Sequence, residues 1–418
     1  MTKVIKRNGN IEEFNREKIE IAIKKAFVEV DGELSDGSLS KAIEIAKFIE
    51  SRDKESLEVE EIQDMVEDKL MASNRKDVAR AYIRYRYDRQ KDRERNNQFI
   101  KGISEKIMAS NVQNQNANVD ENSFGGRMGE ARSYLMREYA LNYIISDMAK
   151  NNHLNNEIYI HDLDSYAVGM HNCLSIPFDD LLKNGFNTRQ TDVRPARSIN
   201  TAFQLVAVIF QLQSLQQFGG VSATHLDWTM VPYVRLSFSK HFKEIMKYMS
   251  DYHIQYSIDP REISIDDERY KKHPKAYKYA LEATEKELSQ AVEGMYHNLN
   301  TLQSRSGNQL PFTSINYGTC TLPEGRMVTK ALLNGSIKGV GKVHKTAIFP
   351  CGIFQCMKGI NRKPGEPNYD LFQLALKSTA LRLYPNYANV DWSVNEGYDR
   401  SDPRTYVATM GKCKLQLI

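Results

Sequence analysis

Apolar and polar positions along the first 95 residues predict a small domain built mainly of helices. Alternating runs at Thr2–Lys6 and Ile11–Phe14 flank the dipeptide Asn8-Gly9, which favours a tight hairpin turn. Later stretches repeat apolar residues every three or four positions, as one face of a helix does. These stretches are Ile19–Phe27, Leu39–Ile49, Glu60–Met71 and Asp77–Arg95. We therefore expect a four-helix domain over residues 1–95, lidded by a β-hairpin.

The next segment, residues 96–132, is polar and rich in asparagine, which predicts a linker or arm. Helical spacing returns over Glu130–Lys150, and beyond it strand-like runs alternate with helical patterns. Clear examples are the strands Pro311–Tyr317 and Thr346–Met357 and the helices Ala202–Leu215, Thr229–Met249, Ala276–Leu302 and Arg326–Ile337. This alternation predicts an α/β barrel or a doubly wound sheet over residues 133–418.

Length and charge narrow the class of protein. The chain has 418 residues, enough for two or three domains. Its net charge of +4, from 57 basic and 53 acidic residues, lacks the basic excess of nucleic-acid-binding proteins. No apolar run approaches the roughly 18–20 residues that cross a bilayer, and the start of the chain lacks the apolar segment of a signal peptide. We therefore expect a cytoplasmic protein that binds neither nucleic acid nor membrane.

The cysteines argue against two common roles. There are five, and an odd number in a long chain does not suit a disulfide framework. Their spacing completes no zinc quartet, so we expect no metal site in this chain. Cys351 and Cys356 fall in a mostly apolar run and are expected in the core.

The predicted hairpin concentrates positive charge. Lys6 and Arg7 precede the turn residue Gly9. Lys18 lies one turn into a helix for which Asn15 is the expected N-cap. Two cations beside a glycine turn and a helix N-terminus suit a polyphosphate. The same residues also fit a solvated basic hairpin, and these few positions do not decide between the two interpretations.

The stretch Ile158–Pro177 reads IYIHDLDSYAVGMHNCLSIP and brings together histidines, acids and a cysteine. Cys173 follows the polar Asn172, a position that fits either inert packing or a thiol at the rim of a buried pocket. The acids after His161 follow an apolar-alternating run that reads as a strand. They either take part in catalysis or bind backbone and cap a helix.

A second polar motif, Val193–Thr201, leads into the apolar helix Ala202–Leu215. Ser198 or Asn200 would cap that helix. Helical N–H groups near two arginines also suit a phosphate or a ribose hydroxyl. Both interpretations stay open at this level.

The full N-terminal pattern V-x-K-R-N-G-x-x-E-x-F-N-x-x-K-I resembles the ATP-cone, a regulatory nucleotide-binding module of many ribonucleotide reductases. Asn8 stands where the module usually has aspartate. The resemblance implies an allosteric site at which ATP permits activity and dATP stops it, with a contribution near Gln63. The residues that it assigns to this site are Val4, Lys6, Arg7, Gly9, Glu12, Asn15 and Lys18.

From residue 105 on, the sequence resembles the catalytic subunit of anaerobic, class III ribonucleoside-triphosphate reductases. The motifs that carry the resemblance are IHDLDSYAVGMHNC, RPARSINTAFQ, QQFGG, LNTLQSRSGNQLPFTSINYGT, KGVGKVHKTAIFP and NYDLFQLALKSTALRLYP. It implies a ten-stranded α/β barrel of the glycyl-radical enzyme type that reduces ribonucleoside triphosphates. It also implies formate as reductant, a radical-SAM activating enzyme as partner, and a homodimer.

The same resemblance assigns roles to individual residues. Cys173 aligns with the cysteine on the reductant side of the ribose. The expected substrate contacts are His161, Asn172, Ser198 and Asn200. The thiyl cysteine of the family lies in a Met-Gly-Cys motif at the tip of a finger loop. Here the sequence reads Met410-Gly411-Lys412-Cys413, which puts the cysteine one position late.

The sequence ends at Ile418, five residues after Cys413. The rest of the finger loop, the remaining strands, the zinc-binding cysteines and the radical glycine are therefore expected outside it. We expect a partial barrel that has no reductase activity by itself. A second interpretation is a catalytically inactive nucleotide-binding fragment. A third, another glycyl-radical enzyme acting on a small acid, is disfavoured by the ATP-cone motif.

Overall fold

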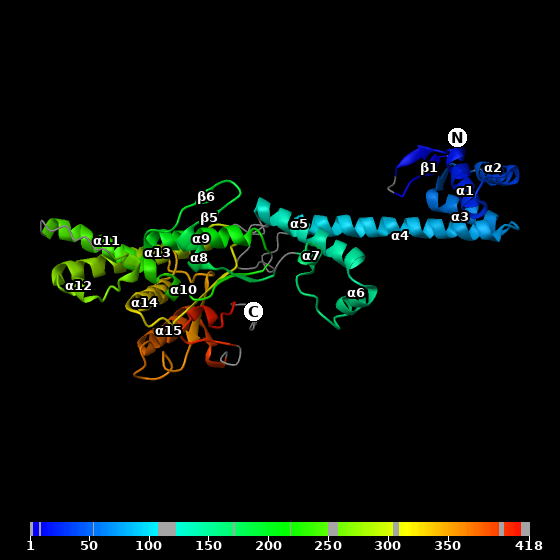
Figure 1. The fold of residues 1–418 in the computed structure, drawn as a ribbon. Coiled ribbons are helices and arrows are strands. Elements are labelled where there is room, and N and C mark those ends of the chain that lie inside the picture. The colour runs from blue at the N-terminus through cyan, green and yellow to red at the C-terminus, as the bar shows by residue number, and fades with distance from the viewer. Residues whose placement is uncertain are drawn as a thin grey trace. The chain divides into compact units, whose positions relative to one another are not determined.

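The computed structural model describes residues 3–7, 10–52, 54–107, 123–169, 172–217, 219–249, 258–303, 309–392 and 397–410. Two compact units divide the chain, Met1–Ser104 and Glu105–Ile418 (Figure 1). Each unit has a hydrophobic core of its own. The first unit thus extends beyond residue 95, the limit expected from the sequence.

A three-stranded sheet opens the first unit. Strands β1 (Lys3–Ile5) and β2 (Ile11–Glu13) pair antiparallel, which confirms the strand pairing expected of the hairpin. The third strand, β3 (Ser56–Glu58), pairs parallel with β1, so the expected two-stranded lid is part of a larger sheet. β3 escaped prediction because one buried residue, Leu57, between two exposed ones is too short a pattern to indicate a strand.

In the described part of this unit, four helices surround one core, as predicted. They are α1 (Arg16–Asp31), α2 (Asp36–Glu50), α3 (Val59–Met71) and α4 (Lys76–Ile107). Asn15 caps α1 as expected, because its side chain accepts the N–H of Lys18 at 3.3 Å. Gly32 ends α1 with a φ of 76°, a left-handed conformation that glycine adopts without strain. The core is mainly aliphatic, with fully buried side chains at Ile23, Ile45, Ile49, Leu57 and Leu70.

Helix α4 continues to Ile107, so the first part of the segment expected to be a polar linker is helical. Lysine, glutamate, glutamine and arginine propagate a helix well even where they give it no apolar stripe. The last part of that segment is helical too, because α5 (Phe124–Tyr139) begins within it. Ser123 caps α5 by accepting the N–H of Gly126 at 3.0 Å.

The single helix expected over Glu130–Lys150 is interrupted. α5 gives way to a π-helical turn, Ala140–Ile144, and α6 (Asp147–Leu154) starts separately. Ser146 explains the restart, since its hydroxyl accepts the N–H of Ala149 and caps the new helix.

The stretch Ile158–Pro177, which contains Cys173, forms less strand than its apolar alternation indicates. It contains a short helix, α7 (Leu163–Tyr166), and the strand β4 covers only Leu174–Ser175. Asp164 accepts a hydrogen bond from the Ser133 hydroxyl of α5 at 2.7 Å. The acid that follows His161 by three positions therefore ties α7 to α5.

A parallel five-stranded sheet lies at the centre of the second unit, in the order β10-β9-β8-β7-β4. Besides β4, its strands are β7 (Val221–Ala223), β8 (Thr313–Tyr317), β9 (Cys351–Cys356) and β10 (Asn386–Asn389). The unit is thus α/β, as predicted, and the strands expected at Pro311–Tyr317 and Thr346–Met357 contain β8 and β9. A small antiparallel pair, β5 (Phe186–Asn187) and β6 (Asp192–Val193), lies apart from this sheet.

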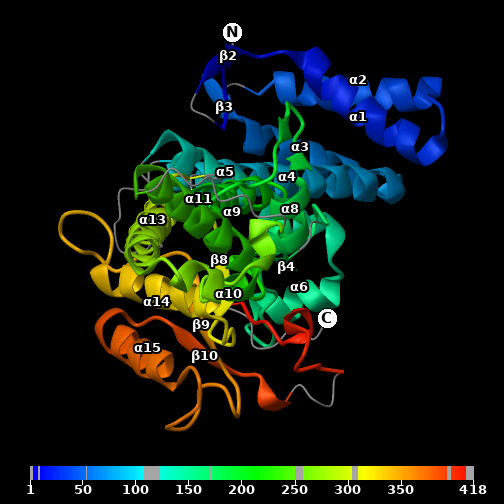
Figure 2. The ribbon, with the colours of Figure 1, turned by 60° about the vertical axis from the view of Figure 1, so that its left-hand side comes forward.

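Helices of the second unit share one large core with the sheet. The longer ones are α9 (Ile199–Ser214), α11 (Val231–Met249), α13 (Pro274–Thr301), α14 (Pro323–Lys338) and α15 (Tyr369–Arg382). The shorter ones are α8 (Phe178–Asn184), α10 (Leu226–Thr229) and α12 (Glu268–Lys271), with 3-10 turns at Pro260–Glu262 and Pro403–Thr405. α13 packs against α9, α11 and α14, and α14 lies beside α15 (Figure 2).

Candidate functional site

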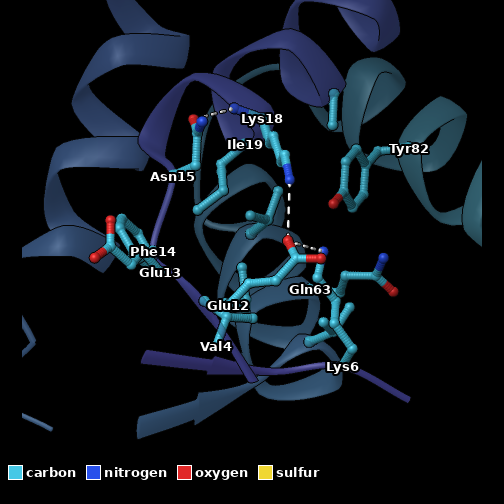
Figure 3. A pocket seen from close by; sticks show the side chains of 14 residues that line it. Val4, Lys6, Glu12, Glu13, Phe14, Asn15, Lys18, Ile19, Gln63 and Tyr82 are labelled. Carbon is cyan, nitrogen blue, oxygen red and sulfur yellow. Dashed lines mark hydrogen bonds and ion pairs between the residues drawn. The ribbon is translucent and has the colours of Figure 1, made fainter. Parts of the chain in front are cut away.

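A cavity of about 160 Å³ opens in the first unit between the hairpin and helices α1, α3 and α4 (Figure 3). Its inner wall is apolar and its mouth carries charged and amide groups. The lining residues are Val4, Lys6, Glu12, Glu13, Phe14, Asn15, Lys18, Ile19, Ala22, Val59, Ile62, Gln63, Val66 and Tyr82. An apolar wall beside two ammonium groups suits a ligand that joins a flat ring to an anionic chain.

Glu12 lies between the two lysines of the cavity. Its Oε2 atom is 3.2 Å from Lys6 Nζ and 3.2 Å from Lys18 Nζ (Figure 3). The hydrogen bond from Lys18, and then that from Lys6, lowers the pKa of Glu12. Glu12 therefore stays ionised and holds both ammonium groups at the cavity mouth.

Five of the residues expected at a nucleotide site line this cavity: Val4, Lys6, Glu12, Asn15 and Lys18. Gln63 lines it as well. Arg7 is placed differently, because its guanidinium pairs with Glu60 and its Nη2 donates to Gln63 Oε1 at 3.0 Å. Gly9 lies outside the described residues.

Tyr82 of α4 lines the cavity and was not foreseen from the sequence. Burial raises the pKa of its phenol to about 12, so the ring is neutral at ordinary pH. Its position on the apolar face of α4, beside the buried Val78 and Ala79, indicated only a core residue. Tertiary packing turns that core position into part of a cavity wall.

In the second unit, strand register separates the two faces of the sheet. Partners in a parallel pair point to the same side, and successive side chains alternate. One face carries residues that join the helical core, such as Val221, Ile315, Tyr317 and Phe354. The opposite face carries Ser175, Ser222, Ser314, Asn316 and Gln355, together with the apolar Cys351 and Ile353 of β9.

The polar face is buried. Ser222, Asn316 and Gln355 are each 0 % exposed. Sheets of this kind usually present apolar side chains on both faces, since both are covered. A buried polar face therefore indicates a site where the sheet meets polar groups rather than a second hydrophobic layer.

Cys173 precedes β4 and, two positions from Ser175, belongs to the polar face. Its Sγ accepts the N–H of Gly220 at 3.3 Å, and its thiol donates to Asn172 Oδ1 at 3.5 Å. Gln217 Nε2 donates to the carbonyl of Gly220 at 2.6 Å. The residues Gln217 and Gly220 of the QQFGG motif thus fix the backbone beside the cysteine.

Residues 407–410 cover part of the same face. Gln355 Nε2 donates to the carbonyl of Val407 at 2.8 Å. Asn316 Nδ2 donates to the carbonyl of Thr409 at 3.1 Å, and its Oδ1 accepts the Thr409 N–H at 3.2 Å. These contacts place the backbone of residues 407–409 along β9 and β8.

Met410 continues this segment towards Cys173. A Cβ atom built on Gly220 would lie 3.7 Å from Met410 Sδ, and Gly220 itself binds the Cys173 sulfur. Cys173 and Met410, the first residue of the expected finger-loop motif and itself expected in the catalytic site, therefore share Gly220 as a neighbour. Cys413 lies outside the described residues.

The residues expected to bind substrate are spread over several elements. Asn172 adjoins Cys173. His161 precedes α7, pairs with Asp162, and has a side chain 72 % exposed. Ser198 caps α9 by accepting the Thr201 N–H at 3.2 Å, and Asn200 is exposed in the first turn of that helix. The structure thus confirms the capping role of Ser198, and of these four residues it places Asn172 beside the cysteine.

Asn316 and Gln355 are the site residues that sequence reasoning missed, because β8 and β9 were interpreted as structural strands only. A signal was present for Gln355, since it puts an amide into the otherwise apolar run of β9. Gln355 Oε1 has no hydrogen-bond partner among the described residues, although the side chain is fully buried. It is an acceptor that can take a hydroxyl from a bound molecule or from water.

Comparison with known families matches both units. The anaerobic ribonucleoside-triphosphate reductase family matches residues 115–418, and the ATP cone domain matches residues 2–91. The two matches define a ribonucleotide reductase type of chain, with an ATP cone ahead of a cysteine-bearing α/β unit. The chain belongs to the anaerobic ribonucleoside-triphosphate reductase family and carries an N-terminal ATP cone.

Similar proteins carry the same description. The anaerobic ribonucleoside-triphosphate reductase of Haemophilus influenzae is 34 % identical over 394 residues, covering 93 % of this chain and 52 % of the relative. That of Escherichia coli is 32 % identical over 392 residues, covering 93 % and 51 %. The chain therefore spans about half the length of these curated relatives.

Solved structures show a weaker likeness. The anaerobic ribonucleotide reductase from Thermotoga maritima in complex with dATP and CTP aligns with a TM-score of 0.44 and 13 % identity. The alignment covers 64 % of this chain and 43 % of that one. The family assignment rests on the sequence matches instead.

The described residues contain neither a candidate membrane span nor a candidate metal site. None of the described helices combines the length and the apolar character that a membrane span requires. No group of three histidine, cysteine, aspartate or glutamate side chains in the described part of the chain could hold a metal ion.

Proposed function

We propose that the cavity of the first unit binds ATP or dATP as an allosteric effector. The observation that supports it most is the convergence of Lys6, Lys18 and Gln63 at the mouth of an apolar cavity. The lysines would neutralise the phosphates, and the apolar wall with Tyr82 would take the base.

Titration calorimetry of the chain with dATP tests this site. We expect Lys6→Ala to weaken binding at least about tenfold, since it removes a charged contact to phosphate. Lys3→Ala, on the same strand but not in the cavity, is the matched control and should bind like the wild type. Equal affinity of Lys6→Ala and Lys3→Ala would refute the assignment.

We further propose that the second unit contributes to anaerobic reduction of ribonucleoside triphosphates, with Cys173 on the reductant side of the ribose. In the overall reaction, the ribonucleotide, formate and a proton give the deoxyribonucleotide, carbon dioxide and water. Cys173 would give the hydrogen atom of its thiol to the sugar as the 2′ hydroxyl takes up the proton and leaves as water, and oxidation of formate to carbon dioxide would restore the S–H bond. The meeting of Cys173, Gly220 and Met410 on a buried polar face supports this role.

The remaining parts of the proposal follow from family membership. The sheet would belong to a ten-stranded barrel, residues 407–410 would enter the finger loop, and His161, Ser198 and Asn200 would contact substrate. A radical-SAM activating enzyme would generate the glycyl radical. The protein would be a cytoplasmic homodimer.

An anaerobic assay with activating enzyme, formate and a ribonucleoside triphosphate tests the reduction. The polypeptide should be assayed together with the remainder of a family member, supplied in the same chain or separately. Cys173→Ser should abolish deoxynucleotide formation and leave dATP binding intact. Cys356→Ser, on the opposite face of the sheet, should keep activity. Reduction that survives Cys173→Ser would refute the role, and dATP binding without any reduction would favour a catalytically inactive nucleotide-binding protein.

A further inference from the structure

Arg7 is the expected phosphate ligand that does not line the cavity. Its Nε pairs with Glu60 and its Nη2 donates to Gln63 Oε1 at 3.0 Å, so the guanidinium is turned towards α3. Gln63 itself lines the cavity, which puts Arg7 next to the site but engaged elsewhere.

Glu60 is shared between two arginines. One carboxylate oxygen pairs with Arg7, and the other is 2.6 Å from Arg86 Nη2. Arg86, on α4, also pairs with Asp64 at 2.7 Å and Glu67 at 2.9 Å. The order of contacts is therefore Arg7, Glu60, Arg86, with Arg86 held by two further carboxylates.

These charges are fixed at ordinary pH. The hydrogen bond from Arg7 is the largest influence on Glu60, and with that from Arg86 it lowers the pKa of this carboxyl. Burial alone would lower the pKa of Arg86, but its hydrogen bonds to Asp64, Glu67 and Glu60 outweigh burial and raise it. Both groups therefore stay charged, and an anion that draws Arg7 away must compete with Glu60 for it.

We propose that Glu60 is a displaceable counter-ion that competes with a polyphosphate for Arg7, while Arg86 retains Glu60 once Arg7 has turned to the phosphates. The inference rests on the proposed nucleotide site. It assigns the role of setting phosphate affinity to two residues, Glu60 and Arg86, that lie outside the cavity lining.

Arg86 makes the exchange feasible. A carboxylate abandoned beside a phosphate chain would repel it and would lose a partner. Glu60 avoids this because its second oxygen is already bonded to Arg86. Asp64 and Glu67 keep Arg86 in place during the exchange.

Only ligands that draw Arg7 into the cavity encounter this competition. A triphosphate reaches the hairpin cations, whereas adenosine has no group to attract a guanidinium. Glu60 should therefore weaken the binding of dATP and leave the binding of adenosine unchanged.

The first test is titration calorimetry of the whole chain with dATP and with adenosine. Glu60→Gln keeps the size of the side chain and removes its charge, so we expect dATP to bind about fivefold more tightly. Adenosine affinity should not change. Glu17→Gln is the matched control, since Glu17 is exposed in the first turn of α1, loses the same charge and does not line the cavity.

The second test changes the other side of the pair. In Arg86→Gln, Glu60 has only Arg7 left among these arginines and should hold it more firmly, so dATP should bind about fivefold more weakly. The double variant Glu60→Gln/Arg86→Gln should bind dATP as Glu60→Gln does, because the competitor is gone. Thermal unfolding of each variant checks that it is folded. The Glu60→Gln and Arg86→Gln results each test the proposal independently.

Equal dATP affinity of Glu60→Gln and Glu17→Gln would overturn the inference, and so would tighter binding by Arg86→Gln. The proposed nucleotide site would still stand after either result, provided that the wild type binds dATP and Lys6→Ala weakens that binding. A wild type that does not bind dATP would instead overturn the proposed effector site, and the inference with it.

Discussion

Asn316 uses one amide to hold a segment more than ninety residues away in the chain. Its Nδ2 donates to Ser222 Oγ, to the carbonyl of Ala223 and to the carbonyl of Thr409, and its Oδ1 accepts the Thr409 N–H. The side chain is 0 % exposed, so solvent cannot replace these bonds. A single residue thus joins β7, β8 and the segment beside Cys173.

Asn316→Asp should destabilise the second unit by about 3 kcal/mol, because the carbonyl oxygens of Ala223 and Thr409 would then face a buried carboxylate. Chemical denaturation measures the loss, and hydrogen exchange should show faster exchange at the Thr409 amide. Asn386→Asp, at an exposed position of β10 in the same sheet, is the control and should change neither quantity. An Asn316→Asp variant with unchanged stability and unchanged exchange at the Thr409 amide would show that Asn316 does not hold this segment.

Tyr82 gives the first unit a predictable response to alkaline pH. Its folded-state pKa of about 12 exceeds the ordinary value of 10.0, because burial disfavours the phenolate. The stability that this group contributes is therefore complete below pH 10 and is lost as the pH rises through 12. A shift of this size corresponds to about 2–3 kcal/mol.

Tyr82→Phe should lose less stability than the wild type between pH 10 and pH 12, since it removes the group that must ionise. Denaturant unfolding of the first unit at pH values below and above this range measures the difference. Parallel pH curves for the two proteins would show that Tyr82 does not titrate as its burial requires.

At the scale of elements, the junction of β4 and β7 depends on a close approach of two backbones. A Cβ atom at Gly219 would lie 1.6 Å from the Asn172 carbonyl oxygen. That distance leaves no room for any side chain, so glycine is required where the QQFGG motif passes the residue before Cys173.

Gly219→Ala should cost the second unit at least about 3 kcal/mol, because the backbone beside Cys173 must shift. The free energy of unfolding measures it. Gly294→Ala is the matched control: Gly294 lies in α13 with nothing within 4 Å of an added Cβ. That change should be neutral or stabilise by up to about 1 kcal/mol. Equal effects of the two substitutions would contradict the close approach.

At the scale of the whole molecule, each of the two units has its own hydrophobic core and its own candidate site. The first unit holds the cavity with its lysines, and the second holds the cysteine on a buried polar face. A ligand that binds one folded unit stabilises that unit by mass action.

Calorimetric unfolding of the whole chain should therefore show that dATP raises the transition of the first unit and leaves that of the second in place. At a hundred times the dissociation constant the gain is about 2.7 kcal/mol. Lys6→Ala should abolish the shift. A shift of both transitions by the same amount would show that the two units unfold as one.

Sequence patterns predicted much of the fold because local periodicity survives folding. The helices α1, α2 and α3 and the N-cap Asn15 fall where their apolar spacing and capping residue put them. The predictions failed where the pattern is short or polar. β3 rests on one buried leucine, and the extension of α4 to Ile107 has no apolar stripe to reveal it.

The sequence by itself determined the family and the identity of the lysines and the cysteine, because motifs of fixed spacing carry that information along the chain. Only the tertiary structure decided which of those residues meet. It brought Met410 to Gly220 beside Cys173, turned Arg7 towards Glu60, and gave Asn316 and Gln355 their buried polar face. The reason is that strand register and long-range packing set these distances, and the spacing of neighbouring residues in the sequence specifies neither of them.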